Sequence, residues 1–229
     1  MRLDKYLCDS GFGTRNEVKK IIKNKIVYIN GELITKADYK VNEIEDTVIV
    51  DGNVVCYKKF SYYMLNKPSG YVSSTSDSKA TVMDLIYEND KDLFPCGRLD
   101  KDTEGLLLIT NDGDLAHKLL SPKNGIEKEY YVETLYNIDE NQIALIEKGI
   151  IKDKVQYKPA KLINVEDNSC HIIITEGKFH EIKEMFLAVN NQVNYLKRLR
   201  MHNLKLDEEL ELGEYRELSE EELNNLKVI

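Results

Sequence analysis

The stretch that decides the fold reads Gly-Arg-Leu-Asp-Lys-Asp-Thr-Glu-Gly at residues 97–105 and continues as Leu-Leu-Leu-Ile-Thr at residues 106–110. The second part is a continuous apolar run, which is typical of a strand that is covered on both faces. The first part is a polar loop that places Asp100 at the mouth of this strand. A carboxylate held there can be rigid and partly desolvated, as a nucleophile or a general base requires. Asp, Thr and Gly are also ordinary turn formers, so the loop by itself leaves a purely structural role open.

Strand and helix patterns surround this stretch on both sides. Further strands are predicted at residues 62–65, 130–134 and 170–175. Asn-Asp-Gly at residues 111–113 turns the chain, and Asp114 is predicted to cap a short helix that ends at Leu120, before Pro122. Apolar residues at helical spacing predict a helix over residues 180–190. This mixture favours an α+β domain with a mostly antiparallel mixed sheet flanked by helices.

The first sixty residues have a different pattern of short elements. Residues 1–25 read as two helical pieces, and Thr14 and Glu17 are spaced as a capping box for the second piece. Asn-Gly at residues 30–31 and Asp-Gly at residues 51–52 each separate two short apolar runs, which predicts two hairpins. We therefore predict a small domain over residues 1–58, a linker that includes Lys58 and Lys59, and a larger domain over residues 59–229.

The charge of the chain is unevenly distributed. The net charge is −8, but residues 1–25 carry seven Lys and Arg against three acids, whereas residues 207–229 carry nine acids against Arg216 and Lys227. Arg15, Lys19 and Lys23 recur on the exposed face of the second helical piece. Local patches set phosphate contacts, so this stripe is suited to RNA, although a solvated helix face has the same pattern.

Several classes of protein are disfavoured. The four Cys residues are scattered without a C-x-x-C pair, which argues against a zinc site or a disulfide framework and favours a reducing cytoplasm. His180 and Glu181 begin like a zinc-protease motif, but Glu184 stands where the second His is required. There is no glycine-rich nucleotide loop, and no apolar run approaches the length of a bilayer crossing. We expect a cytoplasmic protein without cofactor or metal, and a monomer by default.

Four spaced motifs add a family resemblance. Residues 97–107 resemble the catalytic motif of ribosomal pseudouridine synthases, and residues 63–70, 127–132 and 176–185 resemble the family's other motifs in the same order. Residues 1–50 look like the alpha-L RNA-binding domain that is shared with a small-subunit ribosomal protein. The resemblance spans nearly the whole chain. Residues 1–7, 71–75 and 213–216 are most similar to the branch that modifies one uridine of 16S rRNA. Lys178, Glu181 and Glu184 depart from the family's usual residues.

This resemblance implies an activity and a set of site residues. The activity is the isomerisation of uridine to pseudouridine in ribosomal RNA, with no cofactor. Asp100 would be the essential carboxylate, adding to C1′ or removing a proton from C2′, and Lys183 would be its cationic partner. Tyr130 would stack on the flipped uracil and assist proton transfer at C5, and Arg98 would help to hold the base out of the helix. The predicted RNA contacts are Arg98, Lys128 and Lys178 in the larger domain and Arg2, Arg15, Lys19, Lys20 and Lys23 in the smaller one.

Three alternatives compete with this hypothesis. A synthase that acts on 23S rRNA would share the same architecture, and residues 1–50 alone would also suit a non-catalytic RNA-binding factor of ribosome assembly. A glycosidase or nuclease would use paired carboxylates or metal ligands, for which Asp100 and Asp102 are too weak a pair.

Overall fold

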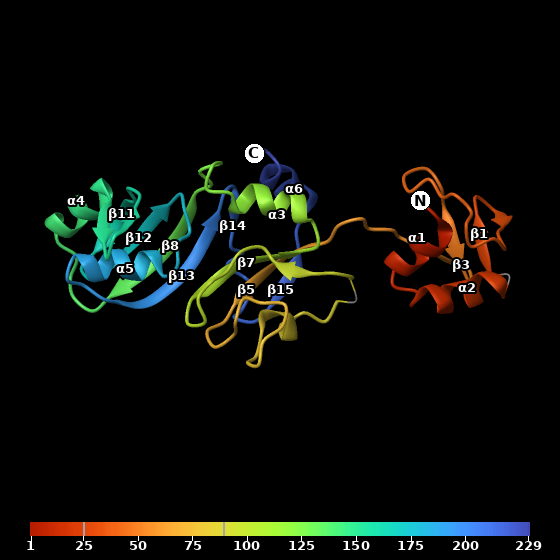
Figure 1. Cartoon of the computed structure of the whole chain (residues 1–229), viewed down its shortest axis with the longest axis horizontal. Coiled ribbons are helices and arrows are strands. Elements are labelled where there is room, and N and C mark those ends of the chain that lie inside the picture. Colours follow the sequence, from red (N-terminus) through yellow and green to blue (C-terminus); the bar gives the residue numbers. More distant parts are fainter. Residues whose placement is uncertain (25, 89) are drawn as a thin grey trace. The chain divides into compact units, whose positions relative to one another are not determined.

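The computed structural model describes residues 1–24, 26–88 and 90–229. The chain forms two compact units, each of which has its own core (Figure 1). The first comprises Met1–Ser61 together with Glu88–Leu93, and the second comprises Tyr62–Tyr87 together with Phe94–Ile229. Among the described residues, no helix is both long and apolar enough to cross a membrane.

The first unit packs two helices against a small antiparallel sheet. Its elements are α1 (Leu3–Asp9), α2 (Arg15–Lys23), β1 (Val27–Ile29), β2 (Glu32–Leu33), β3 (Val48–Val50) and β4 (Asn53–Val54), with strand order β2-β1-β3-β4. Both predicted hairpins are confirmed. Asn30 and Gly31 have φ values of 50° and 84°, and Asp51 and Gly52 have φ values of 49° and 81°, as two-residue hairpin turns require.

The basic helix α2 begins at the predicted capping box. The Thr14 hydroxyl accepts the backbone N–H of Glu17 at 3.4 Å, and the Glu17 carboxylate accepts the backbone N–H of Thr14 at 2.7 Å. Val18 and Ile22 are buried on one face of the helix. Its exposed residues include Arg15, Lys19, Lys20 and Lys23. The predicted basic stripe therefore lies on the solvent side of a helix that is anchored by its apolar face.

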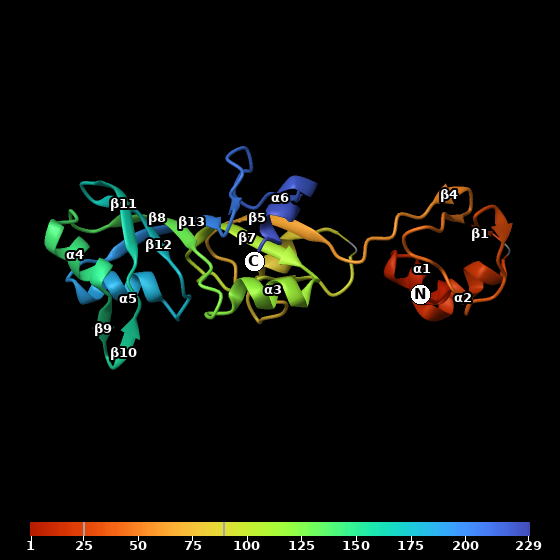
Figure 2. The same cartoon turned by 90° about the horizontal axis from the view of Figure 1, so that it is seen from above.

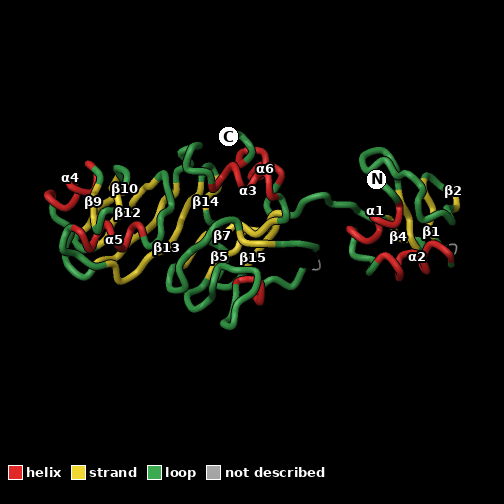
Figure 3. Tube along the Cα trace, in the orientation of Figure 1, coloured by secondary structure: helices red, strands yellow, loops and turns green. Residues whose placement is uncertain are grey.

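The second unit is built on one long sheet, which Figures 2 and 3 show from two directions. Its strands are β5 (Tyr62–Lys67), β6 (Phe94–Pro95), β7 (Glu104–Thr110), β8 (Lys128–Thr134), β11 (Lys161–Glu166), β12 (Ser169–Ile174), β13 (Val193–Met201), β14 (Leu204–Lys205) and β15 (Tyr215–Glu217). The main order is β11-β12-β8-β13-β7-β5-β15. Within the described part of the chain the pairings of this sheet are antiparallel, except that β13 runs parallel to β7.

Helices cover the two halves of this sheet. They are α3 (Gly113–Leu120), α4 (Glu140–Lys148), α5 (Glu181–Ala188) and α6 (Glu220–Leu226). The unit also contains a 3₁₀ turn at Val82–Leu85 and a separate hairpin of β9 (Ile150–Lys152) and β10 (Val155–Tyr157). Helices α4 and α5 pack on the half that contains β11, β12, β8 and β13 (Figure 1). The α+β architecture with a mostly antiparallel sheet is as the sequence predicted.

The cap of α3 differs from the prediction. Asp112, not Asp114, is the N-cap residue, and its Oδ1 accepts the backbone N–H of Leu115 at 3.0 Å. The Tyr62 hydroxyl donates to the other oxygen of Asp112 at 2.7 Å, so this carboxylate is fixed between β5 and the helix. Asp114 lies in the first turn of α3, where a negative charge still interacts favourably with the helix dipole.

The two halves of the sheet meet at Gly105. In the parallel pairing of β7 with β13, Glu104 lies opposite Lys197 and Gly105 opposite Arg198. Gly105 has a φ of +95°, and a Cβ atom at this position would lie 2.3 Å from the backbone oxygen of Arg198. Only glycine therefore permits so close an approach. This junction directly follows the Asp100 loop, so the loop is held at the boundary between the two half-sheets.

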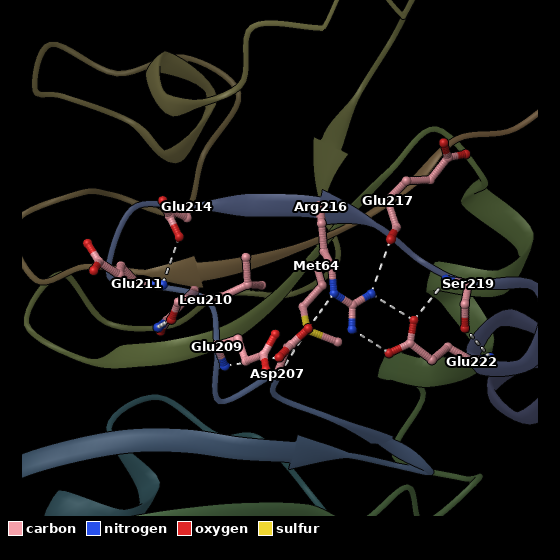
Figure 4. Close-up of polar contacts among 11 residues, drawn as sticks. Met64, Asp207, Glu209, Leu210, Glu211, Glu214, Arg216, Glu217, Ser219 and Glu222 are labelled. Carbon is pink, nitrogen blue, oxygen red and sulfur yellow. Dashed lines mark hydrogen bonds and ion pairs between the residues drawn. The ribbon is translucent and has the colours of Figure 1, made fainter.

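The acidic C-terminal segment is fastened to the sheet by Arg216 (Figure 4). The Arg216 guanidinium donates to Asp207 Oδ2 at 2.6 Å and to both oxygens of Glu222 at 2.7 and 2.8 Å. Hydrogen bonds from Arg216 are the main reason why the pKa of Glu222 falls to about 2. Strand β15, which contains Arg216, pairs with β5, and β5 ends beside the Asp100 loop at Lys67. Asp207 and Glu222, two of the nine acidic residues of this segment, are thus bound in ion pairs with Arg216.

Candidate active site

A cavity in the second unit gathers residues from three of the four motifs, namely those at residues 97–107, 127–132 and 176–185. Its walls are the loop between β6 and β7, the first turn of α5 with the segment before it, and side chains of β8, β12 and β13. The lining residues are Arg98, Leu99, Asp100, Thr103, Tyr130, Ile174, Gly177, Lys178, His180, Glu181, Ile182, Lys183 and Leu196. Three segments that are far apart in the sequence therefore meet around Asp100.

Asp100 is held by two basic side chains from the α5 side. Lys183 Nζ donates to Asp100 Oδ2 at 3.0 Å, and His180 Nε2 lies 3.6 Å from Asp100 Oδ1. The Asp100 side chain is only 26% exposed. Lys183 also donates to Asp102 Oδ1 at 2.6 Å, but the Asp102 side chain is 70% exposed. One ammonium thus bridges two carboxylates, of which only Asp100 lines the inner cavity.

The two carboxylates keep Lys183 charged. Burial by itself would lower the pKa of Lys183, but its hydrogen bonds to Asp102 and Asp100, together with their negative charges, raise that pKa above its ordinary value. For Asp102, burial would raise the pKa, but Lys183 lowers it overall. The structure therefore places a charged ammonium within hydrogen-bonding distance of the Asp100 carboxylate.

Tyr130 forms part of the wall of this cavity. It lies on β8 between Ile172 of β12 and Arg198 of β13, and its side chain is only 7% exposed. Ile174 and Leu196 line the cavity beside it. An aromatic ring with aliphatic neighbours provides a flat apolar surface of the kind that stacks on a nucleobase.

The loop that carries Asp100 is fixed by buried polar groups. The buried Ser73 hydroxyl donates to the Leu99 carbonyl at 3.0 Å and accepts the Leu99 N–H at 3.2 Å. Lys67 is fully buried, and its ammonium donates to the carbonyls of Pro68, Lys101 and Thr103 at 3.0, 3.3 and 2.8 Å. Burial is the main reason why the pKa of Lys67 falls to about 8. The loop is therefore held on both sides of Asp100.

The segment before α5 is fixed by a pair of buried carboxyl groups. Glu181 accepts the Lys178 backbone N–H at 2.8 Å, and Glu176 accepts the Lys158 backbone N–H at 2.8 Å and the Lys178 ammonium. Glu176 and Glu181 are 6% and 4% exposed. Burial, together with the nearby charge of Glu176, raises the pKa of Glu181 to about 7. These contacts position the turn that delivers His180 and Lys183 to Asp100.

Comparisons with known proteins identify the family of the chain. The family model described as RNA pseudouridylate synthase matches residues 61–188, and the S4 domain model matches residues 1–55. A protein named uncharacterized RNA pseudouridine synthase, from Bacillus subtilis (strain 168), is 47% identical over 99% of this chain and 98% of its own length. The chain belongs to the RNA pseudouridylate synthase family.

Two further relatives are similar to this chain over nearly its whole length. The ribosomal small subunit pseudouridine synthase A of Haemophilus influenzae is 36% identical over 99% of both chains. A crystal structure of a pseudouridylate synthase is 36% identical, covers 99% of each chain and superposes with a TM-score of 0.70. The protein is therefore a pseudouridine synthase, an isomerase, and its first unit is an S4 domain, the alpha-L RNA-binding domain of the sequence prediction.

The predicted RNA contacts of the synthase fall into two groups. Arg98 is exposed, as are Arg15, Lys19, Lys20 and Lys23 in the S4 domain. The others are engaged within the protein. Lys128 is 7% exposed and donates to the carbonyls of Ile126 and Glu176, Lys178 donates to Glu176 and the Gln156 carbonyl, and Arg2 pairs with Asp4. An ammonium buried on two carbonyls is not presented to phosphate, so this placement counts against an RNA contact by Lys128.

Sequence reasoning did not assign roles to three residues of this site. Lys67 and Ser73 lie within segments that resembled the family, but only the fold shows that their side chains hold the Asp100 loop. His180 also lies within such a segment, at residues 176–185, but apart from the incomplete zinc motif the sequence gives it no role of its own. A buried lysine or serine that binds backbone carbonyls leaves no spacing pattern in the sequence, because the carbonyls of the Asp100 loop that Lys67 and Ser73 bind lie 26 to 36 residues away.

Proposed function

We propose that this synthase isomerises one uridine of 16S rRNA and that Asp100 supplies the essential carboxylate. The observation that carries the proposal is the meeting of Asp100, Lys183 and Tyr130 in one cavity, although they come from a loop, a helix and a strand. The name of the Haemophilus influenzae relative and the resemblance of residues 1–7, 71–75 and 213–216 support the small subunit as the source of the substrate.

Asp100 is a better candidate than its neighbour Asp102 for three reasons. It is less exposed, it lies in the inner cavity with Tyr130, and it has His180 as a second basic neighbour. A carboxylate that is shielded from water reacts more readily with a sugar carbon or proton than one that is strongly hydrated. We assign to Asp102 the role of a second anchor for Lys183.

The reaction needs only what these side chains supply. The C1′–N1 bond of uridine breaks, the uracil turns, a C1′–C5 bond forms, and the proton on C5 is transferred in the end to N1, so that nothing is oxidised or lost. Asp100 serves the cleavage either by adding to C1′ or by taking a proton from C2′. Both routes require an ionised carboxylate, and the Lys183 ammonium is its hydrogen-bonded counter-charge.

The remaining residues hold the base and the RNA. Tyr130 stacks on the extruded uracil, and its hydroxyl assists the proton transfer at C5. Arg98 takes the place of the extruded base or binds a phosphate. Extrusion of a nucleotide costs a few kcal/mol. The exposed stripe of α2 offsets this cost by binding phosphates, independently of sequence. We further propose that the synthase acts in the cytoplasm as a monomer.

The test is an isomerisation assay on four substrates, namely 16S and 23S transcripts and purified 30S and 50S particles that lack the modification. We expect conversion of one uridine in 16S rRNA, as free RNA or within the 30S particle, and none in 23S rRNA. Conversion only in 23S rRNA would make the synthase a large-subunit enzyme. Tight binding to 16S rRNA without conversion of any uridine would instead indicate a non-catalytic assembly factor.

A further inference from the structure

Phe179 is an exposed aromatic residue at the mouth of the active site. Its side chain is 76% exposed, although most of the large apolar residues of this unit are buried. It lines an outer cavity together with Asp100, Asp102 and Lys183, but it does not line the inner cavity that contains Tyr130. The ring therefore lies beside Asp100 but outside the inner cavity, in which we place the target uracil.

The backbone around Phe179 is held firmly. Lys178 and Glu181, which precede and follow Phe179 and His180, are joined by two hydrogen bonds. The Lys178 N–H donates to the Glu181 carboxylate at 2.8 Å, and the Glu181 N–H donates to the Lys178 carbonyl at 3.2 Å. His180 adopts the left-handed conformation, with φ of 52°, a conformation that costs energy for a residue with a side chain. The exposed ring thus stands on a turn that is ordered before any ligand binds.

The ring of Phe179 is stacked on the ring of His180. Their centroids are 3.7 Å apart, and the ring planes differ by 21°. His180 in turn lies 3.6 Å from Asp100. One face of Phe179 is therefore covered by a residue that contacts the candidate catalytic carboxylate, and the large exposed fraction of the side chain leaves its other face to solvent.

Two cations also line this outer cavity. Arg98 and Lys101 flank Asp100 on its loop, and both are exposed. Among the described residues, neither side chain has a hydrogen bond or ion pair, in contrast to Lys178 and Lys183. An open aromatic face beside uncommitted cations is the combination that binds single-stranded nucleic acid, by stacking on a base and by neutralising phosphates.

We propose that Phe179 is a stacking platform for the base of a nucleotide adjacent to the target uridine. This inference rests on the proposed action on ribosomal RNA. When the uridine turns into the inner cavity, its neighbour loses a stacking partner, and Phe179 replaces that partner. Phe179 is thereby a positioning residue that favours substrates whose target uridine has an unpaired base beside it, whichever base that is, because every base has an aromatic face.

The size of the effect follows from the strength of base stacking. Loss of one contact between an aromatic side chain and a base reduces affinity by roughly 5- to 150-fold. We expect Phe179→Ala to lower kcat/KM within this range, chiefly through KM. Phe179→Tyr keeps the aromatic face and should remain close to wild type. Phe179→Leu keeps apolar bulk without an aromatic face and should behave like Phe179→Ala. Because the ring is exposed, melting temperatures should be unchanged in all three variants.

The decisive experiment combines these variants with altered RNA. The substrate is a fragment of whichever rRNA the wild-type synthase modifies, with an abasic nucleotide placed in turn on the 5′ and 3′ sides of the mapped uridine. On one side, removal of the base should lower kcat/KM of the wild type about as much as Phe179→Ala does. On that same RNA, Phe179→Ala should cause almost no further loss, since the two changes remove the same contact.

Two results would overturn the inference. One is an unchanged kcat/KM for Phe179→Ala on the normal fragment. The other is that the losses in kcat/KM caused by Phe179→Ala and by the abasic nucleotide are independent and multiply, whether the abasic nucleotide is on the 5′ or the 3′ side of the uridine. This would mean that Phe179 does not contact the base of either neighbour. These outcomes differ from a failure of the proposed function. If the proposed function is wrong, the wild type converts no uridine in either rRNA, and the stacking role of Phe179 is then wrong as well.

Discussion

Lys67→Met tests how the Asp100 loop is held in place. The Lys67 ammonium is buried under this loop and donates to the carbonyls of Pro68, Lys101 and Thr103 at 3.0, 3.3 and 2.8 Å. Methionine has a similar unbranched shape but no donor. The substitution therefore removes the three hydrogen bonds with little change in packing.

The expected change in stability is small because two effects oppose each other. The pKa of Lys67 falls from 10.5 to about 8, and one pKa unit corresponds to about 1.4 kcal/mol, so charging this amine costs roughly 3 kcal/mol more in the folded protein than in water. The Met variant avoids that cost. It also loses three hydrogen bonds, each of which contributes about 1 kcal/mol. The free energy of unfolding at pH 7 should therefore change by less than about 1.5 kcal/mol.

The expected change in activity is much larger. Without the ammonium, the loop carbonyls on the C-terminal side of Asp100 lose their shared donor, and the carboxylate is no longer fixed against the substrate. A misplacement on the order of 1 Å can cost about 100-fold in rate. We therefore expect kcat to fall about 10- to 100-fold while the protein stays folded.

The assay pairs urea unfolding with tritium release from RNA that contains [5-³H]uridine, since C5 loses its hydrogen during isomerisation. Lys123→Met, on an exposed side chain, is the matched control. The pKa of Lys67 is lower in the folded protein than in the unfolded chain. The free energy of unfolding of the wild type should therefore rise by up to about 3 kcal/mol relative to that of Lys67→Met as pH rises from 8 to 10.5. A Lys67→Met protein with wild-type kcat would refute the reasoning. A difference in unfolding free energy between the wild type and Lys67→Met that stays constant from pH 8 to pH 10.5 would refute it as well.

Three further predictions concern the cation, the buried carboxyl pair and the basic stripe. Lys183→Met should lower kcat at least about 100-fold, because Asp100 then loses the cation that holds its carboxylate in place, and near-normal kcat would show that the ion pair is dispensable. The pKa of Glu181 is raised to about 7, so the wild type loses stability as pH rises from about 4.5 through 7. Glu181→Gln should avoid this loss, so its free energy of unfolding should exceed that of the wild type by up to about 3 kcal/mol at pH 8. Urea unfolding at pH 5 and pH 8 measures the difference, and an equal gain in unfolding free energy at both pH values would contradict the raised pKa of Glu181. Reversal of Arg15, Lys19 and Lys23 to Glu should flatten the plot of log K against log salt by a slope of roughly three, and an unchanged slope would mean that the stripe is only a solvated helix face.

Local features of the fold followed from the sequence. The turns at Asn30-Gly31 and Asp51-Gly52 and the capping box of Thr14 each depend on residues within a few positions of one another. The apolar run before Asn111 forms the buried strand β7, as its pattern predicted. The cap of α3 lies two residues before the predicted one. Asp112 and Asp114 both have the side chain of a capping residue, and in the structure Asp112 accepts the Leu115 N–H and the Tyr62 hydroxyl.

The geometry of the site did not follow from local patterns. Asp100 and Lys183 are 83 residues apart, and the sequence suggested their pairing only through a family resemblance. The parallel pairing of β7 with β13 has no local signal, although it brings the two half-sheets together at Gly105. The burial of Lys67 and Lys128 also escaped sequence reasoning, since a lysine is assigned to the surface unless its partners are known.

The most direct test of the central claim compares Asp100→Asn with Asp102→Asn. Both side chains bind the same Lys183 ammonium, at 3.0 and 2.6 Å, so both substitutions disturb that cation, but only Asp100 lines the inner cavity with Tyr130. The measurement is single-turnover conversion of uridine in 16S rRNA, with RNA affinity and unfolding recorded for each protein. We predict at least a roughly 1000-fold loss for Asp100→Asn and less than about a 10-fold loss for Asp102→Asn, with RNA affinity nearly unchanged in both. Substantial conversion by a folded Asp100→Asn protein, or an inactive Asp102→Asn beside an active Asp100→Asn, would contradict the account.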